Sequence, residues 1–550
     1  MTFDHLTKAP FNLDSEAIAW VKATLAGLSP DDKLRQLFNL RIAGDNPNDV
    51  AAIKAFRPGG ITRHAGSDMA AERALIAELN AGGSVPLLIS ADLEGSRMSL
   101  AGGAEMPNPL ALAAIDDVEV TAEVSRIMAE EARAIGINWS FTPVLDINAA
   151  FRSAIVATRG FGSDVATVEK HALTQMRVFQ QNGVASAVKH WPGEGFDDRD
   201  QHLVTTIDPL SIADWEATFG RLYRGAIEAG VLSVMSAHIA LPEFVRSVDP
   251  EAGVEAYRPA SLSRMLNEEL LRKRLGFNGL IVSDATGMAG MGNWAKRSET
   301  IPQLVTAGCD VILFANDPEQ DLGYVRAALA DGRLTQARVD EAIMRQLALK
   351  AALGLHRPPA PVPSVPTEKN RVYADAVARR APTLVKDVQC LLPLDPQKHK
   401  RVLVVSGGIV FPFFPDPLPF ALPEMLRQHG FEVTIYTPET EVDPTRFDLM
   451  LYLFGDETLL TRGRIFLDWL GLTGHFGKAM QRYWHDIPTA MISFGYPYML
   501  YDAPRVPTYI NAYSTTETMQ RAVVELLLGN GTWNQHSPVD PFCGLPDAKY

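Results

Sequence analysis

The stretch Lys189–His202 combines a basic pair, three glycine or proline positions, several carboxylates and a histidine. It directly follows the apolar run Val184–Val188, whose β-branched residues predict a buried strand. Loops that follow strands of a rigid scaffold often carry function. We therefore expect binding or catalytic residues here, against the alternative of a solvated loop with ordinary surface charges.

Asp200 and His202 stand two positions apart in this stretch, so their side chains can reach one another. An Asp that orients a His and balances its charge makes the His a general acid/base near neutral pH. The alternative is a loop His beside an unrelated Asp. Lys189, His190 and Arg159 supply donors suited to sugar hydroxyls or a carboxylate, and Asp92 supplies an acceptor.

Asp284 ends the apolar run Leu280–Ser283. A carboxylate at the end of a buried strand is costly unless it is paired or used. The residue is expected to be a nucleophile or electrostatic stabiliser, or to cap the next helix, and the residues alone leave both open. No cluster has metal-ligand spacing, so no metal and no cofactor are expected. The G-x-S-x-G motif of serine hydrolases is absent.

Strand candidates recur at wide intervals, with helical segments such as Val118–Ala134 and Val165–Gln181 between them. This alternation predicts a (β/α)₈ TIM barrel, a fold of about 250 residues or more. The polar residues that close a strand at its carboxyl end, where barrel active sites lie, are Asp92, Asp146, Lys189, His190, His238 and Asp284. The expected strands are 38–42, 59–62, 86–91, 137–145, 184–188, 231–237, 280–283 and 311–314.

The chain is expected to divide into two domains. Residues 1–355 form the barrel, the Pro-rich stretch 356–370 is a semi-rigid linker, and residues 371–550 form a three-layer α/β/α sandwich with a mainly parallel sheet. The five expected strands of the second domain are 401–405, 431–436, 449–454, 489–493 and 507–510. A nucleotide loop is not expected after the first of them, because Ser406-Gly407-Gly408 lacks both known phosphate-binding patterns.

Composition narrows the functional class. The 550 residues carry a formal net charge of −14, which disfavours partners such as nucleic acid or an anionic membrane. No apolar run approaches the ~18 residues that span a bilayer, and no signal peptide is visible. Three widely spaced cysteines fit a reduced, cytoplasmic compartment. The expected partners are a small carbohydrate and, at most, a second copy of the chain in a homodimer.

Several motifs resemble those of glycoside hydrolase family 3, in order and over most of the chain. Lys189-His190-Trp191-Pro192-Gly193 with Asp200-x-His202 is similar to the K-H-F-P-G…D-x-H signature of the β-N-acetylhexosaminidase branch. Asp92-x-Glu94-Gly95-x-Arg97, Arg159-Gly160-Phe161-Gly162-Ser163-Asp164 and Ser283-Asp284…Met288 resemble further family segments.

This resemblance implies a retaining hydrolase with a barrel followed by an α/β domain. It assigns Asp284 as the nucleophile, and His202 paired with Asp200 as the acid/base. Its sugar-binding residues would be Asp92, Arg159, Lys189, His190 and Met288. The family usually has His where Glu194 stands. Because Gly193 and Gly195 let the backbone approach a sugar closely, we expect an ionised Glu194 to accept from substrate hydroxyls; the alternatives are a proton-transfer role and a salt-bridged loop carboxylate.

The sequence thus predicts a cytoplasmic, exo-acting β-N-acetylhexosaminidase that removes a terminal N-acetylglucosamine-like sugar from cell-wall or chitin-derived oligosaccharides. A β-glucosidase and a glycoside phosphorylase of the same family are the nearest alternatives. A non-catalytic sugar-binding protein on the same barrel is the alternative from another class.

Overall fold

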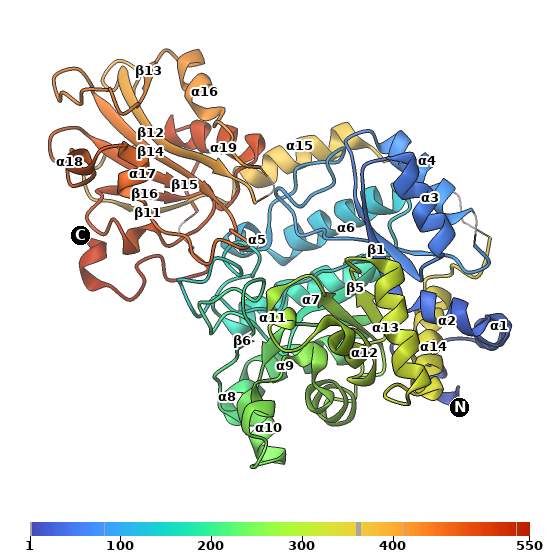
Figure 1. Cartoon of the computed structure of the whole chain (residues 1–550). Coiled ribbons are helices and arrows are strands. Elements are labelled where there is room, and N and C mark those ends of the chain that lie inside the picture. Colours follow the sequence, from blue (N-terminus) through green and yellow to red (C-terminus); the bar gives the residue numbers. More distant parts are fainter. Residues whose placement is uncertain (1–2, 82, 359–364, 413, 535) are drawn as a thin grey trace.

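The structure is a computed structural model that describes residues 3–550 except 82, 359–364, 413 and 535 (Figure 1). Eight parallel strands close into a barrel in the order β1-β10-β9-β7-β5-β4-β3-β2, which confirms the predicted fold of the first domain. The strands are β1 (Phe38–Ala43), β2 (Gly60–His64), β3 (Leu88–Ala91), β4 (Trp139–Ser140), β5 (Ala185–Trp191), β7 (Ser233–Ser236), β9 (Leu280–Ala285) and β10 (Val311–Leu313). A two-stranded ribbon, β6 (Thr206–Ile207) with β8 (Ile239–Ala240), lies outside the barrel sheet.

Helices surround the barrel, and their starts follow from local sequence. Ser29 caps α2 by accepting from the Asp32 backbone N–H, and Pro30 occupies the first turn. The helices of this half are α1 (Ser15–Gly27), α2 (Pro30–Gln36), α3 (Pro47–Phe56), α4 (Met69–Asn80), α5 (Pro109–Ile115), α6 (Val118–Ile135), α7 (Val165–Gln181), α8 (Ile212–Ala217), α9 (Phe219–Glu228), α10 (Pro242–Val248), α11 (Ala289–Gly292), α12 (Arg297–Thr306), α13 (Pro318–Ala330) and α14 (Gln336–Ala352), with a π-helix over Met265–Arg274.

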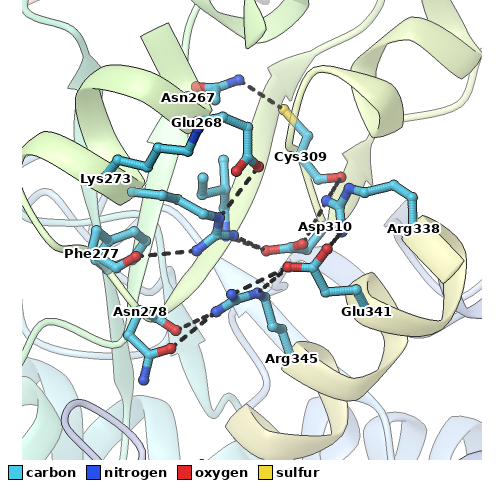
Figure 2. Close-up of polar contacts among 12 residues, drawn as sticks. Asn267, Glu268, Lys273, Phe277, Asn278, Cys309, Asp310, Arg338, Glu341 and Arg345 are labelled. Carbon is cyan, nitrogen blue, oxygen red and sulfur yellow. Dashed lines mark hydrogen bonds and ion pairs between the residues drawn. The ribbon is translucent and has the colours of Figure 1, made fainter. Parts of the chain in front are cut away.

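A buried ionic network surrounds Asp310, at the amino-terminal ends of strands β9 and β10 (Figure 2). Asp310 immediately precedes β10, and its carboxylate accepts from Arg272 Nη2 at 2.8 Å and Arg338 Nη2 at 2.7 Å. The same carboxylate accepts from the backbone N–H of Ile281 at 2.9 Å, at the start of β9. The network joins the residue before β10 to the start of β9, at the end of the barrel opposite to the carboxyl ends, where barrel active sites lie.

The second domain is built on a six-stranded sheet in the order β11-β16-β15-β14-β12-β13, shown in orange and red in Figure 1. Every pair is parallel except β11 with β16. The strands are β11 (Thr383–Asp387), β12 (Arg401–Val410), β13 (Glu432–Ile435), β14 (Leu449–Asp456), β15 (Thr489–Ser493) and β16 (Thr508–Asn511). The helices are α15 (Thr367–Ala378), α16 (Leu422–Gln428), α17 (Trp469–Thr473), α18 (Phe476–Ala479) and α19 (Glu517–Leu527).

Two features of this domain were not predicted. The antiparallel edge strand β11 is absent from the sequence-based list, because it is short and lacks an alternating pattern. Helix α15 begins at Thr367, inside the stretch 356–370 that was expected to be linker, and residues 359–364 of that stretch lie outside the described residues. The buried residues Ala374 and Val377 of α15 belong to the core of the barrel.

No helix in the described part of the chain is long and apolar enough to cross a membrane.

Candidate active site

A cavity of about 810 Å³ lies at the carboxyl ends of the barrel strands, under loops of the second domain. Of the residues predicted to form the site, seven line it: Asp92, Arg159, Lys189, His190, His202, Asp284 and Met288. Residues of the second domain complete its wall, among them Val410, Phe414, Glu457, Leu460 and Thr461. The structure therefore brings together side chains that are almost 200 positions apart in the barrel.

Asp284 is the penultimate residue of β9 and is 8% exposed. Its Oδ1 accepts from the backbone N–H of Ala285 at 2.7 Å. Burial alone would raise the pKa of Asp284, but the nearby imidazoles of His238, His190 and His202 bring it below its ordinary value. An ionised carboxylate on the cavity wall can act as a nucleophile.

His202 and Asp200 form the predicted dyad. Asp200 Oδ1 lies 2.7 Å from His202 Nδ1 and also accepts from the His202 backbone N–H at 2.8 Å. Burial would raise the pKa of Asp200, but the hydrogen bond and charge of His202 hold it below the ordinary value. An ionised carboxylate only accepts, so Nδ1 carries the proton and Nε2 is left to exchange a proton with a ligand.

The second domain reaches this dyad. The backbone N–H of Thr461 donates to Oδ2 of Asp200 at 2.8 Å, and Thr461 itself adopts a left-handed backbone conformation with φ 67°. A second hydrogen bond joins the domains beside the cavity, where Ser96 Oγ of the barrel donates to Glu457 Oε1 at 2.8 Å. The same oxygen accepts from the backbone N–H of Thr515, within the second domain, at 2.8 Å. Both contacts fix second-domain loops against loops of the barrel.

A chain of buried charges forms the polar floor of the cavity. Glu94 accepts from Arg159 Nε at 2.8 Å and lies 2.6 Å from Lys189 Nζ. Lys189 Nζ also donates to Asp92 Oδ1 at 2.8 Å. Burial would raise the pKa of Glu94, but the charges of Arg159 and Lys189 hold it far below its ordinary value. These groups present hydrogen-bond donors and acceptors to the cavity.

His190 is oriented by Asp146, which follows β4. His190 Nδ1 lies 2.5 Å from Asp146 Oδ2, and the His190 backbone N–H donates to Asp146 Oδ1 at 3.0 Å. His190 Nε2 lies 3.3 Å from Arg159 Nη2. His238, the other strand-end histidine, is fully buried, and its Nε2 lies 3.0 Å from the carbonyl oxygen of Ala285, next to the nucleophile candidate.

Glu194 is the predicted substrate contact that the structure does not place on the cavity wall. Its side chain is 2% exposed, and Oε2 accepts from Gln201 Nε2 at 3.0 Å. Burial, together with the charge of Asp146, raises the pKa of Glu194 well above its ordinary value, which favours the neutral acid. A direct contact with substrate hydroxyls stays a prediction, and this arrangement does not favour it.

Asp146, His190 and Glu194 also bring one potential metal-ligand atom each within 4.8 Å of one another. In this arrangement His190 Nδ1 is already hydrogen-bonded to Asp146, and a guanidinium lies beside the other ring nitrogen. Three protein ligands are enough for a catalytic zinc, but hydrogen bonds satisfy the His and Asp atoms here. The chemistry of this donor set thus fits a hydrogen-bonded network better than a metal centre.

Three residues that contribute to the candidate site are absent from the set predicted from the sequence. Glu94 lies in the Asp92-x-Glu94-Gly95-x-Arg97 motif, which signals a site residue, but the motif does not indicate that Glu94 pairs with Arg159 and Lys189. Gln201 stands between the two dyad members, and its sequence position does not indicate its contacts with Glu194 and the His238 backbone. The backbone N–H of Thr461 has no sequence signal, because any residue except proline supplies one.

The fold and this cavity define a barrel enzyme with a carboxylate on the cavity wall, a His–Asp dyad and a charged floor suited to a polyol. Residues 30–349 match the "Glycosyl hydrolase family 3 N terminal domain". A "Beta-N-acetylglucosaminidase/beta-glucosidase" of Cellulomonas fimi is 38% identical over 99% of both chains. The chain belongs to glycoside hydrolase family 3 and is a glycoside hydrolase, as the motifs predicted.

Solved structures agree with this assignment. A structure titled "Beta-glucoside phosphorylase BglX" superposes with a TM-score of 0.91 and 34% identity, covering 100% of both chains. A family 3 β-N-acetylglucosaminidase from Paenibacillus sp. str. FPU-7 superposes with a TM-score of 0.80 and 26% identity, covering 94% of this chain and 100% of the other. Similarity over whole chains extends the family relationship to the second domain.

Proposed function

We propose that the protein is a retaining, exo-acting β-glycosidase that releases a terminal β-linked N-acetylglucosamine-type sugar by double displacement. The observation that carries this proposal is that His202, paired with Asp200, and the carboxylate of Asp284 line the same cavity. A retaining glycosidase needs one group to protonate the leaving oxygen and a second to attack the anomeric carbon.

In the first step, a carboxylate oxygen of Asp284 attacks the anomeric carbon while His202 Nε2 donates its proton to the glycosidic oxygen. The bond from the anomeric carbon to the leaving oxygen breaks, the alcohol departs, and a glycosyl ester of Asp284 remains. His202 starts this step as the imidazolium, which the ionised Asp200 stabilises. After Nε2 has given up its proton, Asp200 holds the neutral ring as the Nδ1-protonated tautomer, whose Nε2 is then the base for the second step.

In the second step, His202 Nε2 takes a proton from water as the water oxygen attacks the anomeric carbon. The ester bond to Asp284 breaks, and the sugar leaves with its original anomeric configuration. Asp92, Arg159, Lys189 and His190 would hold the hydroxyls of the terminal sugar, because they form the floor beside the nucleophile. Loops of the second domain lie over the cavity, which favours cleavage of a terminal sugar over cleavage within an oligosaccharide chain.

The proposal also specifies which sugar the enzyme releases. The relative from Cellulomonas fimi is named for both N-acetylglucosaminides and glucosides and matches over nearly its whole length, whereas shorter relatives are named as hexosaminidases. We take an N-acetylglucosaminide as the first substrate to test, with the β-glucoside beside it. A cytoplasmic location is part of the same proposal and is supported by three free cysteines in the described chain.

A phosphorylase is the second candidate, and one observation favours it. The acid/base is an imidazole, so an attacking phosphate meets no carboxylate in that position and less like-charge repulsion than in glycosidases with two carboxylates. The full-length structural match titled as a β-glucoside phosphorylase points in the same direction. The chemistry of the first step is the same, and only the nucleophile of the second step differs.

A substrate panel tests both candidates. The 4-nitrophenyl β-glycosides of N-acetylglucosamine and of glucose are each incubated with and without inorganic phosphate, and the sugar product and its anomer are identified by NMR. Free sugar with retained configuration supports the hydrolase, and sugar 1-phosphate with a phosphate-dependent rate supports the phosphorylase. Binding without turnover of either glycoside would overturn the enzymatic proposal, and an inverted product would overturn the double displacement.

A further inference from the structure

Gln201, which stands between the two members of the acid/base dyad, is anchored on the side away from the cavity. It is 1% exposed, and its Oε1 accepts from the backbone N–H of His238 at 3.0 Å. Because the carbonyl end of this carboxamide is occupied by an N–H donor, the amino end must find an acceptor. It finds one in Glu194 Oε2, at 3.0 Å.

The main chain around Gln201 is equally confined. The carbonyl of His202 accepts from the Ala289 backbone N–H at 3.0 Å. A Cβ at Gly290 would lie 2.3 Å from the carbonyl oxygen of Gln201, so the two segments are in direct contact. The dyad segment is thus held against the segment that follows the nucleophile strand, and a shift of the Gln201 side chain would move its neighbours.

Glu194 is itself fixed at both ends of its backbone. Its N–H donates to Asp146 Oδ1 at 3.1 Å, and its carbonyl accepts from the Ile147 N–H at 3.1 Å. Gly195, with φ 114°, lets the chain pass so close to Ile147 that a Cβ would fall 1.9 Å from a carbonyl oxygen. From this fixed backbone, Glu194 Oε2 reaches Gln201 Nε2 at 3.0 Å, and the same oxygen lies 3.7 Å from His190 Nδ1.

We propose that Glu194 is a positioning residue for the acid/base, acting through the Gln201 carboxamide to hold His202 in line with the leaving oxygen. This inference rests on the proposed function, in which His202 protonates that oxygen. Glu194 does not touch the substrate in this role, so its effect depends on how much protonation a leaving group needs. The neutral acid that burial favours accepts a hydrogen bond from Gln201 as a carboxamide oxygen would.

The test compares two glycosides of the sugar that the wild-type enzyme cleaves, one with a 2,4-dinitrophenolate leaving group and one with a methanol leaving group. Glu194→Ala should lower kcat/KM for the methyl glycoside by roughly ten- to thirty-fold, a part of the 10²–10⁴-fold that a general acid contributes. The loss for the dinitrophenyl glycoside should stay below about three-fold, because that leaving group needs little protonation. Glu194→Gln, which keeps an acceptor oxygen, should recover most of the loss.

Gln201→Ala breaks the same contact from the other side and should show the same selective loss, with the double variant no worse than either single one. It also keeps the test valid if Glu194→Ala fails to fold. The matched control is Glu131→Ala on helix α6. Glu131 and Glu194 are each 3% exposed as whole residues, and Glu131 likewise accepts from a side-chain amide, Asn370 Nδ2 of α15, at 2.8 Å. This variant should lose stability and leave the ratio of the two rates unchanged.

Equal losses on both glycosides, additive losses in the double variant, or no recovery in Glu194→Gln would each overturn the positioning role. Equal losses that persist in Glu194→Gln would instead support direct contact with the sugar. His202→Ala separates this inference from the proposed function. If that variant shows no dependence on the leaving group, the acid/base assignment itself falls; if it does and Glu194→Ala does not, only the inference on Glu194 falls.

Discussion

The backbone N–H of Thr461 donates to Oδ2 of Asp200 across 2.8 Å, although the two residues are 261 positions apart in the chain. Asp200 therefore uses one oxygen for the histidine of the barrel and the other for the second domain. A carboxylate held by two partners keeps its orientation when the cavity is empty. Docking of the second domain and the geometry of the His202–Asp200 pair are consequently coupled.

The dyad predicts a dependence on the leaving group. His202→Ala should lose roughly 10²–10⁴-fold in kcat/KM on substrates with poor leaving groups and much less on activated aryl glycosides. Asp200→Ala should show the same trend more mildly, because Asp200 only orients and tunes the imidazole. Steady-state kinetics over a series of aryl leaving groups measures this as the slope of log rate against leaving-group pKa. Slopes equal to that of the wild type would contradict the acid/base role.

Asp284→Asn should abolish turnover of every substrate, by at least about 10³-fold, because the amide cannot form the ester intermediate. Near-ultraviolet circular dichroism verifies that the variant is folded. Met288→Leu, which changes a neighbouring wall residue of similar volume, is the matched control and should lose far less. A folded Asp284→Asn enzyme with wild-type kcat would remove this residue from the mechanism.

The network at the amino-terminal end of the barrel predicts a large effect on stability. Asp310→Asn should lower the free energy of unfolding by about 3–5 kcal/mol, since it leaves the buried guanidiniums of Arg272 and Arg338 without their shared carboxylate. Glu269→Gln breaks the exposed pair with Lys273 and should cost less than about 1 kcal/mol. Urea unfolding of both variants measures the difference. Similar midpoints would show that the network does not stabilise the barrel.

Lys350 predicts a pH dependence of stability. It lies fully buried on α14, with Nζ 3.1 Å from Gln36 Oε1, and burial lowers its pKa to about 7. In the unfolded chain a lysine keeps its proton up to about pH 10.4. Between these two values the unfolded state binds more protons, so Lys350 makes the free energy of unfolding rise with pH, by at most about 1.4 kcal/mol per pH unit.

Lys350→Met should remove this contribution while it fills the same space. Denaturant unfolding at several values between about pH 7 and pH 9 gives the slope for each protein. The wild type should gain stability relative to the variant as the pH rises, and the variant should be the more stable of the two at the acidic end. Parallel curves would mean that the lysine keeps its proton in the folded state.

Much of the fold could be predicted because its strands are apolar runs separated by amphipathic helices. The helix expected over Val165–Gln181 is α7 with the same bounds, and Asp92 and Asp284 lie at the strand ends where the barrel pattern placed them. Parallel strands in a barrel bring all such ends to one face, so Asp92, Lys189, His190 and Asp284 of the cavity wall could be anticipated from strand order. Arg159, His202 and Met288 also line the cavity, and they were expected from the family motifs instead.

The direction of Glu194 could not be predicted in the same way. Its neighbours Gly193 and Gly195, with φ 137° and 114°, turn the chain so that the side chain points into the protein instead of the cavity. Glycine adopts such positive φ angles freely, so the sequence indicates that the turn is possible but not which way the Glu194 side chain points. Contacts made by second-domain loops, such as that of Thr461, depend on tertiary packing that has no local pattern.

Glu94 holds Arg159 and Lys189 together before any sugar arrives. Three long side chains that would otherwise sample many rotamers are therefore immobilised during folding, and substrate binding need not order them again. Each immobilised chain of this kind would otherwise cost a ligand about 0.5–1.5 kcal/mol. In the proposed function these side chains bind the sugar, and they would then form a rigid receptor whose conformational entropy has already been lost. Binding energy would remain for distorting the sugar ring toward the transition state.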